Sequence, residues 1–329
     1  MASPKLELQR EHGREEILFS LSGCDGEFYA GGSDGRVHCL NPTGEPAPTR
    51  PPLEGHQSYV TGVACSRSYL WSVSYDGLLN RWSVESGSLI SSQKAHQKWI
   101  RDVQLSPDGM TLATAGDDMK LRLWDSQTGS LIHSLEGHAE QSPQGFSSML
   151  YTCCFSPDGA LIASADRIGE ILIWEVSSGQ LLQRWHASTM YTWDEVQRLR
   201  SIGGIRSLCF SPDQSTLAVG GMGHVQNVDG LGGKARIEWF ELQSGKQVGT
   251  FESEAHKGLV EGLQFTPEGS HLVAAGGSSK GFLILLEPKA EKAALEVESP
   301  MYVHQAVFTS DQGDLLVVGH HKATSWKLT

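Results

Sequence analysis

The sequence predicts an all-β fold built from tandem copies of one small module of four short antiparallel strands. Three observations support this prediction. A pattern of about forty residues recurs along the chain, and a turn of the form Ser-Pro-Asp-Gly returns within it. The 37 glycines, against 13 prolines, indicate many tight turns. Because one such module cannot bury both faces of a twisted sheet, its copies must stack around an axis. The predicted fold is therefore a seven-bladed β-propeller.

The repeat is visible in three segments that align directly. LNRWSVESGSLISSQKAH ends at His96, LRLWDSQTGSLIHSLEGH ends at His138 and ILIWEVSSGQLLQRWH ends at His186. The turn occurs at residues 106–109 and 156–159, and degenerate copies follow at 211–214 and 266–269. One aromatic or apolar residue before the second turn of each copy serves as its anchor: Leu40, Trp82, Trp124, Trp174, Phe240, Leu286 and Trp326. By subtraction these anchors lie 42, 42, 50, 66, 46 and 40 residues apart, so seven units are present.

Alternating apolar residues indicate four strands in each unit, separated by turns of small residues. The unit before His138 shows them in the order Ile100/Val103/Leu105, Leu112/Ala113, Leu121/Leu123 and Leu131/Ile132.

Short motifs within the units resemble those of the WD-repeat family. Gly-His pairs open two blades at Gly55-His56 and Gly137-His138, and a third strand ends in Trp124-Asp125. Asp-Gly turns stand at Asp34-Gly35 and Asp76-Gly77. Elsewhere the Trp-Asp pair is replaced, as in Trp82-Ser83, Trp174-Glu175, Phe240-Glu241 and Trp326-Lys327. The resemblance covers essentially residues 1–329 and implies a single WD-repeat propeller domain.

The two ends of the chain predict how the last blade is completed. The final unit stops after three strands, at SWKLT, while LELQREH near the N-terminus matches the fourth-strand ending SLEGH. We therefore expect residues 5–11 to supply the missing strand, which removes two exposed sheet edges.

Two polar sets invite comparison with a nucleophilic triad. They are His56, Ser72, Asp76 and Trp82 in blade two, and His96, Thr114, Asp118 and Trp124 in blade three. In the WD-repeat family, matching residues form a buried hydrogen-bonded chain from indole to hydroxyl to imidazole to carboxylate. The sets recur in register, and they degrade elsewhere, with Ile168 at the carboxylate position in blade four. They are therefore predicted to be structural, and no catalytic residue is predicted.

Three insertions, at residues 139–148, 187–203 and 222–233, interrupt the repeat in blades four and five. Strand parity places them on one face, here called the upper face, and inserted loops on a rigid scaffold often carry function. TWDEVQRLRSIG in the second insertion predicts a short helix with a capping box, which must dock because it is too short to be stable alone. Trp193 either anchors this helix on the propeller or faces a partner. The third insertion is rich in glycine and is expected to be mobile until something binds.

A partner surface is predicted at the channel mouth, where the innermost strands begin. Large aromatic and arginine side chains at an exposed mouth are typical of interaction hot spots, although aromatic residues here can also simply cap the inner packing. Arg101 and Arg206 suit bidentate contact with a carboxylate or phosphate. The predicted partner-binding residues are Tyr59, Trp99, Arg101, Tyr151, Trp193, Arg206 and Tyr302.

Composition limits the classes of ligand. With 38 acidic against 26 basic residues the net charge is −12, which disfavours nucleic acid and anionic membranes as partners. The chain shows neither an apolar run long enough to span a membrane nor a signal peptide.

Four histidines lie outside the repeat register, namely His224, His304, His320 and His321. No metal-ligand motif joins them, so no metal and no cofactor is predicted. Cys24, Cys39, Cys65, Cys153, Cys154 and Cys209 form no CxxC pair and are expected to be reduced thiols in a cytoplasmic protein.

These observations favour a non-enzymatic scaffold for protein–protein interaction, a monomer on its own, that binds a protein or peptide on the upper face near blades four and five and the channel mouth. The alternative is an enzyme, or a propeller that binds a small molecule or metal, with its site at the same mouth, since propellers host both roles.

Overall fold

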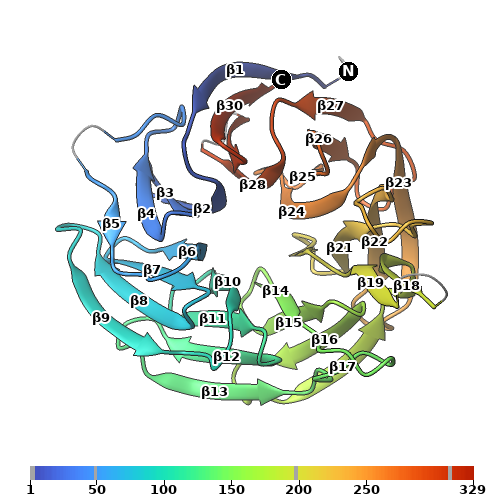
Figure 1. The fold of residues 1–329 in the computed structure, drawn as a ribbon, viewed down its shortest axis with the longest axis horizontal. Helices are drawn as coiled ribbons and strands as arrows, with labels where there is room; N and C mark the ends of the chain where they lie inside the picture. The colour runs from blue at the N-terminus through green and yellow to red at the C-terminus, as the bar shows by residue number, and fades with distance from the viewer. Residues whose placement is uncertain (1–3, 48–49, 196–198, 310–312) are drawn as a thin grey trace. The chain divides into compact units, whose positions relative to one another are not determined.

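The computed structural model describes residues 4–47, 50–195, 199–309 and 313–329. The described residues form seven four-stranded antiparallel sheets and one two-stranded hairpin (Figure 1). The fold class is therefore the predicted seven-bladed β-propeller. The blades fall into two compact units, each described by itself. The terminal unit comprises Lys5–Glu136 and His304–Thr329, and the central unit comprises Gly137–Val303.

The terminal unit contains blades one, two, three and seven. Blade one consists of β2 (Leu18–Cys24), β3 (Glu27–Gly32), β4 (Arg36–Leu40) and β5 (Leu53–Glu54). Blade two consists of β6 (Val60–Cys65), β7 (Tyr69–Ser74), β8 (Leu78–Ser83) and β9 (Leu89–Lys94). Blade three consists of β10 (Ile100–Leu105), β11 (Thr111–Gly116), β12 (Lys120–Asp125) and β13 (Leu131–Glu136). Blade seven consists of β28 (Val303–Phe308), β29 (Asp314–Gly319), β30 (Lys322–Leu328) and β1 (Leu6–Gly13).

The central unit contains blades four, five and six. Blade four consists of β14 (Leu150–Phe155), β15 (Leu161–Asp166), β16 (Glu170–Glu175) and β17 (Leu181–His186). A 3-10 turn, η1 (Ser188–Met190), then leads into the hairpin of β18 (Tyr191–Asp194) and β19 (Arg200–Gly203). Blade five consists of β20 (Ser207–Phe210), β21 (Thr216–Met222), β22 (Lys234–Glu241) and β23 (Gln247–Lys257). Blade six consists of β24 (Leu259–Phe265), β25 (Leu272–Gly277), β26 (Gly281–Leu286) and β27 (Leu295–Ser299).

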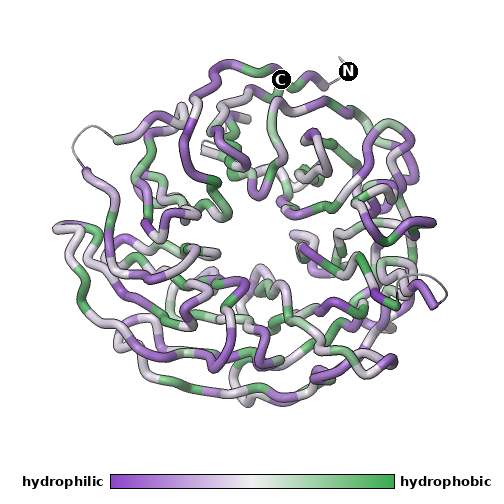
Figure 2. The backbone as a smooth tube through the Cα atoms, viewed as in Figure 1, coloured by the Kyte–Doolittle hydropathy of each residue, from purple (hydrophilic) through white to green (hydrophobic). Residues whose placement is uncertain are grey.

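The core of each unit lies between the faces of successive blades. All seven predicted anchors are buried, with exposed fractions of 5% or less. In the terminal unit Leu79 and Ile100 share one apolar cluster with Trp124, which joins blades two and three. In the central unit Ile171 and Phe210 belong to a cluster that joins blades four and five. Figure 2 shows hydrophobic and hydrophilic stretches along the backbone. Strands inside a blade, such as β11, are almost entirely buried, whereas outer strands such as β9 and β13 are mostly exposed.

The N-terminal strand completes blade seven, as the sequence predicts. β1 pairs antiparallel with β30, from Leu6 opposite Leu328 to Gly13 opposite Lys322, and the two strands lie side by side in Figure 1. The amide of Lys5 donates to the carbonyl of Thr329 at 2.8 Å, and the amide of Thr329 donates back at 2.9 Å. The strand runs two residues further than the predicted 5–11.

The helix predicted within 187–203 is wrong, because this segment forms the β18–β19 hairpin. Thr192 lies opposite Ile202, so hydrogen bonds across the hairpin replace helical ones. Two residues have positive φ angles that a helix excludes, namely Leu199 at 50° and Gly203 at 101°. A Cβ at position 203 would approach the carbonyl oxygen of Met190 to 2.2 Å, so only glycine fits there. Val196 of the predicted apolar stripe lies outside the described residues.

The expectation of six reduced thiols is wrong for one pair. Cys24 ends β2, Cys65 ends β6, and these residues form a disulfide with their Cα atoms 6.0 Å apart. The inner strands of adjacent blades bring the two cysteines together, and a sequence separation of 41 gave no sign of this. The free cysteines are Cys39, Cys153, Cys154 and Cys209. Burial raises the pKa of the Cys39 thiol to about 11 and of the Cys209 thiol to about 12, so both thiols are unreactive at neutral pH.

Removal of residues 1–11 is expected to lower the melting temperature by about 10 °C, because β30 would lose its ladder partner and become an exposed edge. Differential scanning calorimetry of the truncated chain measures this change, with a deletion of residues 1–4 as the control. Equal melting temperatures for the two deletions would contradict closure by β1.

Candidate interaction surface

A β-bulge occurs at the same place in the innermost strand of five blades. In blade three Ile100 pairs with Gly116 and Asp102 pairs with Ala115, so Arg101 has no opposite residue in the ladder. A bulge bends the strand and redirects the side chain at that point. The residues at the matching positions of the other four blades are Phe19, Thr61, Tyr151 and Glu261. A repeated backbone feature thus presents a different side chain in each blade.

In the terminal unit, aromatic rings form a continuous row, here called the aromatic row. The ring of Phe19 lies 5.1 Å from that of His304 and 5.6 Å from that of Tyr59. Tyr59 lies 5.8 Å from Tyr75, and Tyr75 stacks on Trp99 at 4.3 Å with an interplanar angle of 9°. The row comprises His320, His304, Phe19, Tyr59, Tyr75 and Trp99.

The predicted residues Tyr59 and Trp99 are exposed members of this row, at 47% and 48%. Phe19 and Tyr75 were missed. Phe19 of blade one occupies the same bulge position as Arg101 of blade three. Tyr75 directly follows a second strand, a position for which the repeat gave no functional signal.

Arg101 holds the end of the row in place. Its Nε and Nη2 donate to the two carboxylate oxygens of Asp117 at 2.9 and 2.8 Å, and its Nη1 donates to the Tyr75 hydroxyl at 2.5 Å. The guanidinium also lies 4.8 Å from the centre of the Tyr75 ring and 5.1 Å from that of Trp99. Asp117 therefore takes up the bidentate contact that the sequence assigned to a ligand, and Arg101 positions Trp99 instead.

In the central unit, the other predicted mouth residues contact one another. The Arg206 guanidinium lies 3.7 Å from the centre of the Tyr151 ring, a cation–π contact. Tyr302 donates its hydroxyl to Glu261 at 2.6 Å. Burial, together with the Glu261 carboxylate, raises the pKa of Tyr302 far above its usual value, so the phenol stays protonated.

The three insertions form one layer in the central unit. Tyr191 of the second insertion donates to Gln144 of the first at 2.8 Å. The Thr192 hydroxyl lies 3.2 Å from His224 Nδ1 and accepts from the Val225 amide in the third. Val225 and Val228 are buried with Met222 and Leu259, so part of the third insertion, for which mobility is expected, packs against the chain. The layer lies in blades four and five, as predicted.

Trp193 contacts the chain itself within this layer. It is partly buried, and its ring lies 5.3 Å from that of Phe146, which is half exposed. The two rings form an apolar patch on the insertion layer.

The polar sets of blades two and three are hydrogen-bonded chains. In blade two the Trp82 indole donates to Ser72 Oγ at 2.8 Å, His56 Nε2 lies 2.8 Å from the same oxygen, and His56 Nδ1 lies 3.0 Å from Asp76. The corresponding distances in blade three are 2.9, 2.7 and 2.7 Å, through Trp124, Thr114, His96 and Asp118. Each chain satisfies polar groups whose burial without partners costs about 1–3 kcal/mol apiece.

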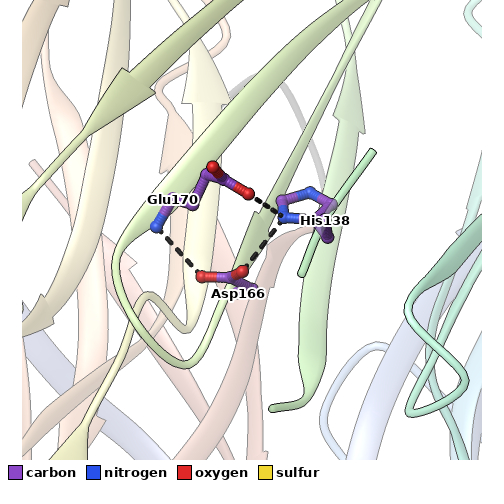
Figure 3. Close-up of side chains that lie close together, drawn as sticks. All are labelled: His138, Asp166 and Glu170. Carbon is purple, nitrogen blue, oxygen red and sulfur yellow. Dashed lines mark hydrogen bonds and ion pairs between the residues drawn. The ribbon is translucent and has the colours of Figure 1, made fainter. Parts of the chain in front are cut away.

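Blade four carries a third set, although Ile168 occupies the expected carboxylate position. Asp166, two residues earlier, supplies a carboxylate oxygen 3.1 Å from His138 Nδ1, and Glu170 supplies another at 3.3 Å (Figure 3). Ser164 Oγ accepts from the Trp174 indole at 3.0 Å and lies 2.9 Å from His138 Nε2. The expectation that the set is degraded in blade four is therefore wrong, because a carboxylate from the end of β15 replaces the one lost from the turn.

Two carboxylates shift the pKa of His138 in the opposite direction from that of His96. Burial lowers the pKa of His138, but hydrogen bonds to Asp166 and Glu170 outweigh burial and raise it. Burial lowers the pKa of His96, and the single Asp118 only partly opposes this effect. Glu170 also forms an ion pair with Arg184. With His138 protonated, two cations balance two carboxylates.

Donor atoms of His138, Asp166 and Glu170 all lie within 4.8 Å of one another, and imidazole with carboxylate is a donor set that divalent metals accept. The charge balance already reached with Arg184 means that a bound divalent cation and a neutral His138 would leave one excess positive charge in a buried place. The geometry of this cluster therefore fits a protonated histidine better than a metal ion.

Comparison with known proteins identifies the repeat. The family model described as WD domain, G-beta repeat, matches residues 87–125, 129–175 and 193–225. The matched repeats lie in a chain that folds into seven four-stranded blades. The chain contains WD repeats and folds as a seven-bladed β-propeller. Within the described ranges, this WD-repeat chain has no helix long and apolar enough to cross a membrane.

Curated relatives match parts of this WD-repeat protein. The nuclear distribution protein PAC1-2 of Uncinocarpus reesii is 40% identical over 78 residues, which are 24% of this chain and 17% of that protein. The apoptotic protease-activating factor 1 of Rattus norvegicus is 29% identical over 200 residues, 60% of this chain and 14% of that protein. The eukaryotic translation initiation factor 3 subunit I of Caenorhabditis briggsae is 27% identical over 106 residues, 32% of each. The matches thus span less than a third of each relative's length.

The imidazole of His138 is expected to titrate above pH 6.5 and that of His96 below it. Protonated His138 stabilises the fold below pH 6.5, and this contribution is lost as the pH rises through the raised pKa of the folded state. Nitrogen-15 NMR of the imidazole rings measures both titrations. Glu170→Gln should lower the pKa of His138 and leave His96 unchanged. A pKa for His138 at or below that of His96 would contradict this assignment.

Proposed function

We propose that this WD-repeat chain is a non-enzymatic interaction platform that binds a partner protein or peptide. The aromatic row of the terminal unit supports this proposal most directly. Tyr59 and Trp99 leave about half of their surfaces exposed, and Trp99 is fixed by its stack on Tyr75. Rigid, exposed aromatic side chains are typical of binding hot spots, because little side-chain entropy is lost when a partner covers them.

A second contact region is proposed on the insertion layer and the neighbouring mouth residues of the central unit. Trp193 with Phe146, and Tyr151 with Arg206, supply aromatic surface backed by contacts within the chain. Tyr302 adds a further aromatic side chain to this region, and its hydrogen bond to Glu261 holds it in place. Inserted loops on a regular scaffold commonly carry the specific contacts, since they alone depart from the repeat.

One relative bears on the proposal by its name. The initiation factor subunit is by name part of a larger assembly.

The polar sets also favour a binding role over catalysis. They recur in three blades with the same bonding, whereas an active site is needed once, and their hydroxyls are committed to indole and imidazole partners.

Affinity capture from native lysate tests the proposal. We expect Trp99→Ala, and the triple variant Trp99→Ala/Arg101→Ala/Arg206→Ala, to lose most of the proteins that the wild type retains. The single variant is needed because loss of Arg101 also leaves the buried Asp117 carboxylate unpaired. Leu131→Ala, which trims a half-exposed side chain on the outer strand β13, is the matched control. Identical retained proteins for wild type and both Trp99 variants would refute the proposed surface.

The alternative function, an enzyme or a small-molecule or metal-binding propeller, draws on the His138, Asp166 and Glu170 cluster. Elemental analysis of the purified protein is expected to find no metal at stoichiometric level, since Arg184 and protonated His138 already balance the carboxylates. A stoichiometric ion that disappears with Glu170→Gln would favour the alternative. Labelling of Ser72 by a serine-reactive fluorophosphonate would do the same for an enzyme.

We also propose a cytoplasmic monomer that uses neither nucleic acid nor membrane as its partner. The four free cysteines support the location, and the Cys24–Cys65 disulfide opposes it. The net charge of −12 argues against polyanionic partners. Light scattering gives the mass in solution, and thiol labelling in intact cells reports the state of Cys24 and Cys65.

A further inference from the structure

Beside the aromatic row, the terminal unit has a pocket of about 440 Å³ at the junction of blades two and three. It lies where β7 ends and β10 begins, so it belongs to the same end of the strands as the inner bulges. The residues that line it are Tyr75, Lys94, Gln97, Lys98, Trp99 and Asp117.

The aromatic side of the pocket is rigid. Trp99 stacks on Tyr75, and Arg101 contacts both rings while it is tied to Asp117. Two contacts, with Tyr75 and with Arg101, thus hold an indole that remains 48% exposed. A flat apolar surface is therefore ready for an apolar side chain of a ligand without further ordering.

The rest of the pocket is cationic. Lys94 and Lys98 are exposed, and among the described residues neither forms an ion pair with a carboxylate. The Lys94 ammonium donates to the backbone carbonyl of Asp76 at 2.7 Å, which fixes its position and leaves its charge unneutralised. Asp117 adds no free negative charge, because Arg101 binds both of its oxygens. A local excess of positive charge therefore stands on a chain whose net charge is −12.

We propose that this pocket receives an acidic segment of a partner protein, with a carboxylate between Lys94 and Lys98 and an apolar side chain on the exposed face of Trp99. This inference rests on the proposed interaction function and adds the chemistry of the partner. In a segment with alternating acidic and apolar residues, the acidic side chains can pair with the two lysines and the apolar side chains can pack on the indole.

A protein segment fits the pocket better than a nucleic acid does. The cations of the pocket are limited to Lys94 and Lys98, whereas binding of a phosphate backbone needs a longer positive track. The surrounding negative charge of the chain repels an extended polyanion, but a short acidic segment meets mainly the local cations.

Fluorescence anisotropy with a labelled peptide of alternating glutamate and proline tests this inference, since proline rings can lie flat on the indole. We expect wild type to bind it and to bind the matched glutamine–proline peptide about tenfold more weakly, because the charge-assisted contacts are lost. Lys98→Glu and Trp99→Ala should each weaken the glutamate peptide about tenfold or more. The control Arg67→Glu makes the same kind of charge reversal at the β6–β7 turn, where the side chain is 87% exposed, and should bind as wild type does.

Equal affinity for the glutamate and glutamine peptides, or equal weakening by Lys98→Glu and Arg67→Glu, would overturn the acidic-partner inference. Displacement of the peptide by oligothymidylate at equal charge would overturn it in favour of nucleic acid. If Trp99→Ala also loses the proteins captured from lysate while the peptides bind equally, the interaction function stands and only the partner chemistry fails. If capture is unchanged as well, both proposals fail.

Discussion

The structure depends on the burial of both faces of every blade. A four-stranded sheet of six-residue strands cannot do this alone, so each blade within a unit presents large anchors such as Trp82 and Trp124 to the core. Burial of an indole also removes its N–H from water. The hydroxyl of Ser72 or Thr114 accepts that N–H, and imidazole and carboxylate follow in turn. The apparent catalytic residues are thus a consequence of burying tryptophan, and this explains why they recur.

The same repetition separates architecture from specificity. Every inner strand that carries the bulge bends at an equivalent residue, yet the side chains presented there differ from blade to blade. Arg101 illustrates the outcome. The bulge determines where its side chain lies. The Asp117 carboxylate neutralises its charge, and its planar guanidinium contacts the Tyr75 and Trp99 rings that stack on each other. A binding surface of rigid aromatic groups results from a backbone feature that the repeat imposes.

The features that could be predicted from sequence are those that recur or alternate. The anchors, the strands of each blade and the strand that completes blade seven follow from periodicity, as does the exposed position of Tyr59 and Trp99. Contacts between distant residues could not be read in this way. The segment 191–203 has helix-forming residues, but pairing of Thr192 with Ile202 and bonding of Thr192 to the third insertion outweigh a weak local preference. The partners Cys24 and Cys65, Tyr75 and Trp99, and Arg101 and Asp117 likewise meet only in the folded chain.

The pairing of β1 with β30 makes the two ends of the described chain immediate neighbours, joined through Lys5 and Thr329. Segments joined to the two ends of the described chain would therefore both attach at the same edge of blade seven. Such a module can be spliced into a loop of a larger host with little strain on the host, or circularly permuted by linking its ends and reopening it at a surface turn. Fusions at either end depart from the same edge of blade seven, whereas the Trp99 pocket lies between blades two and three.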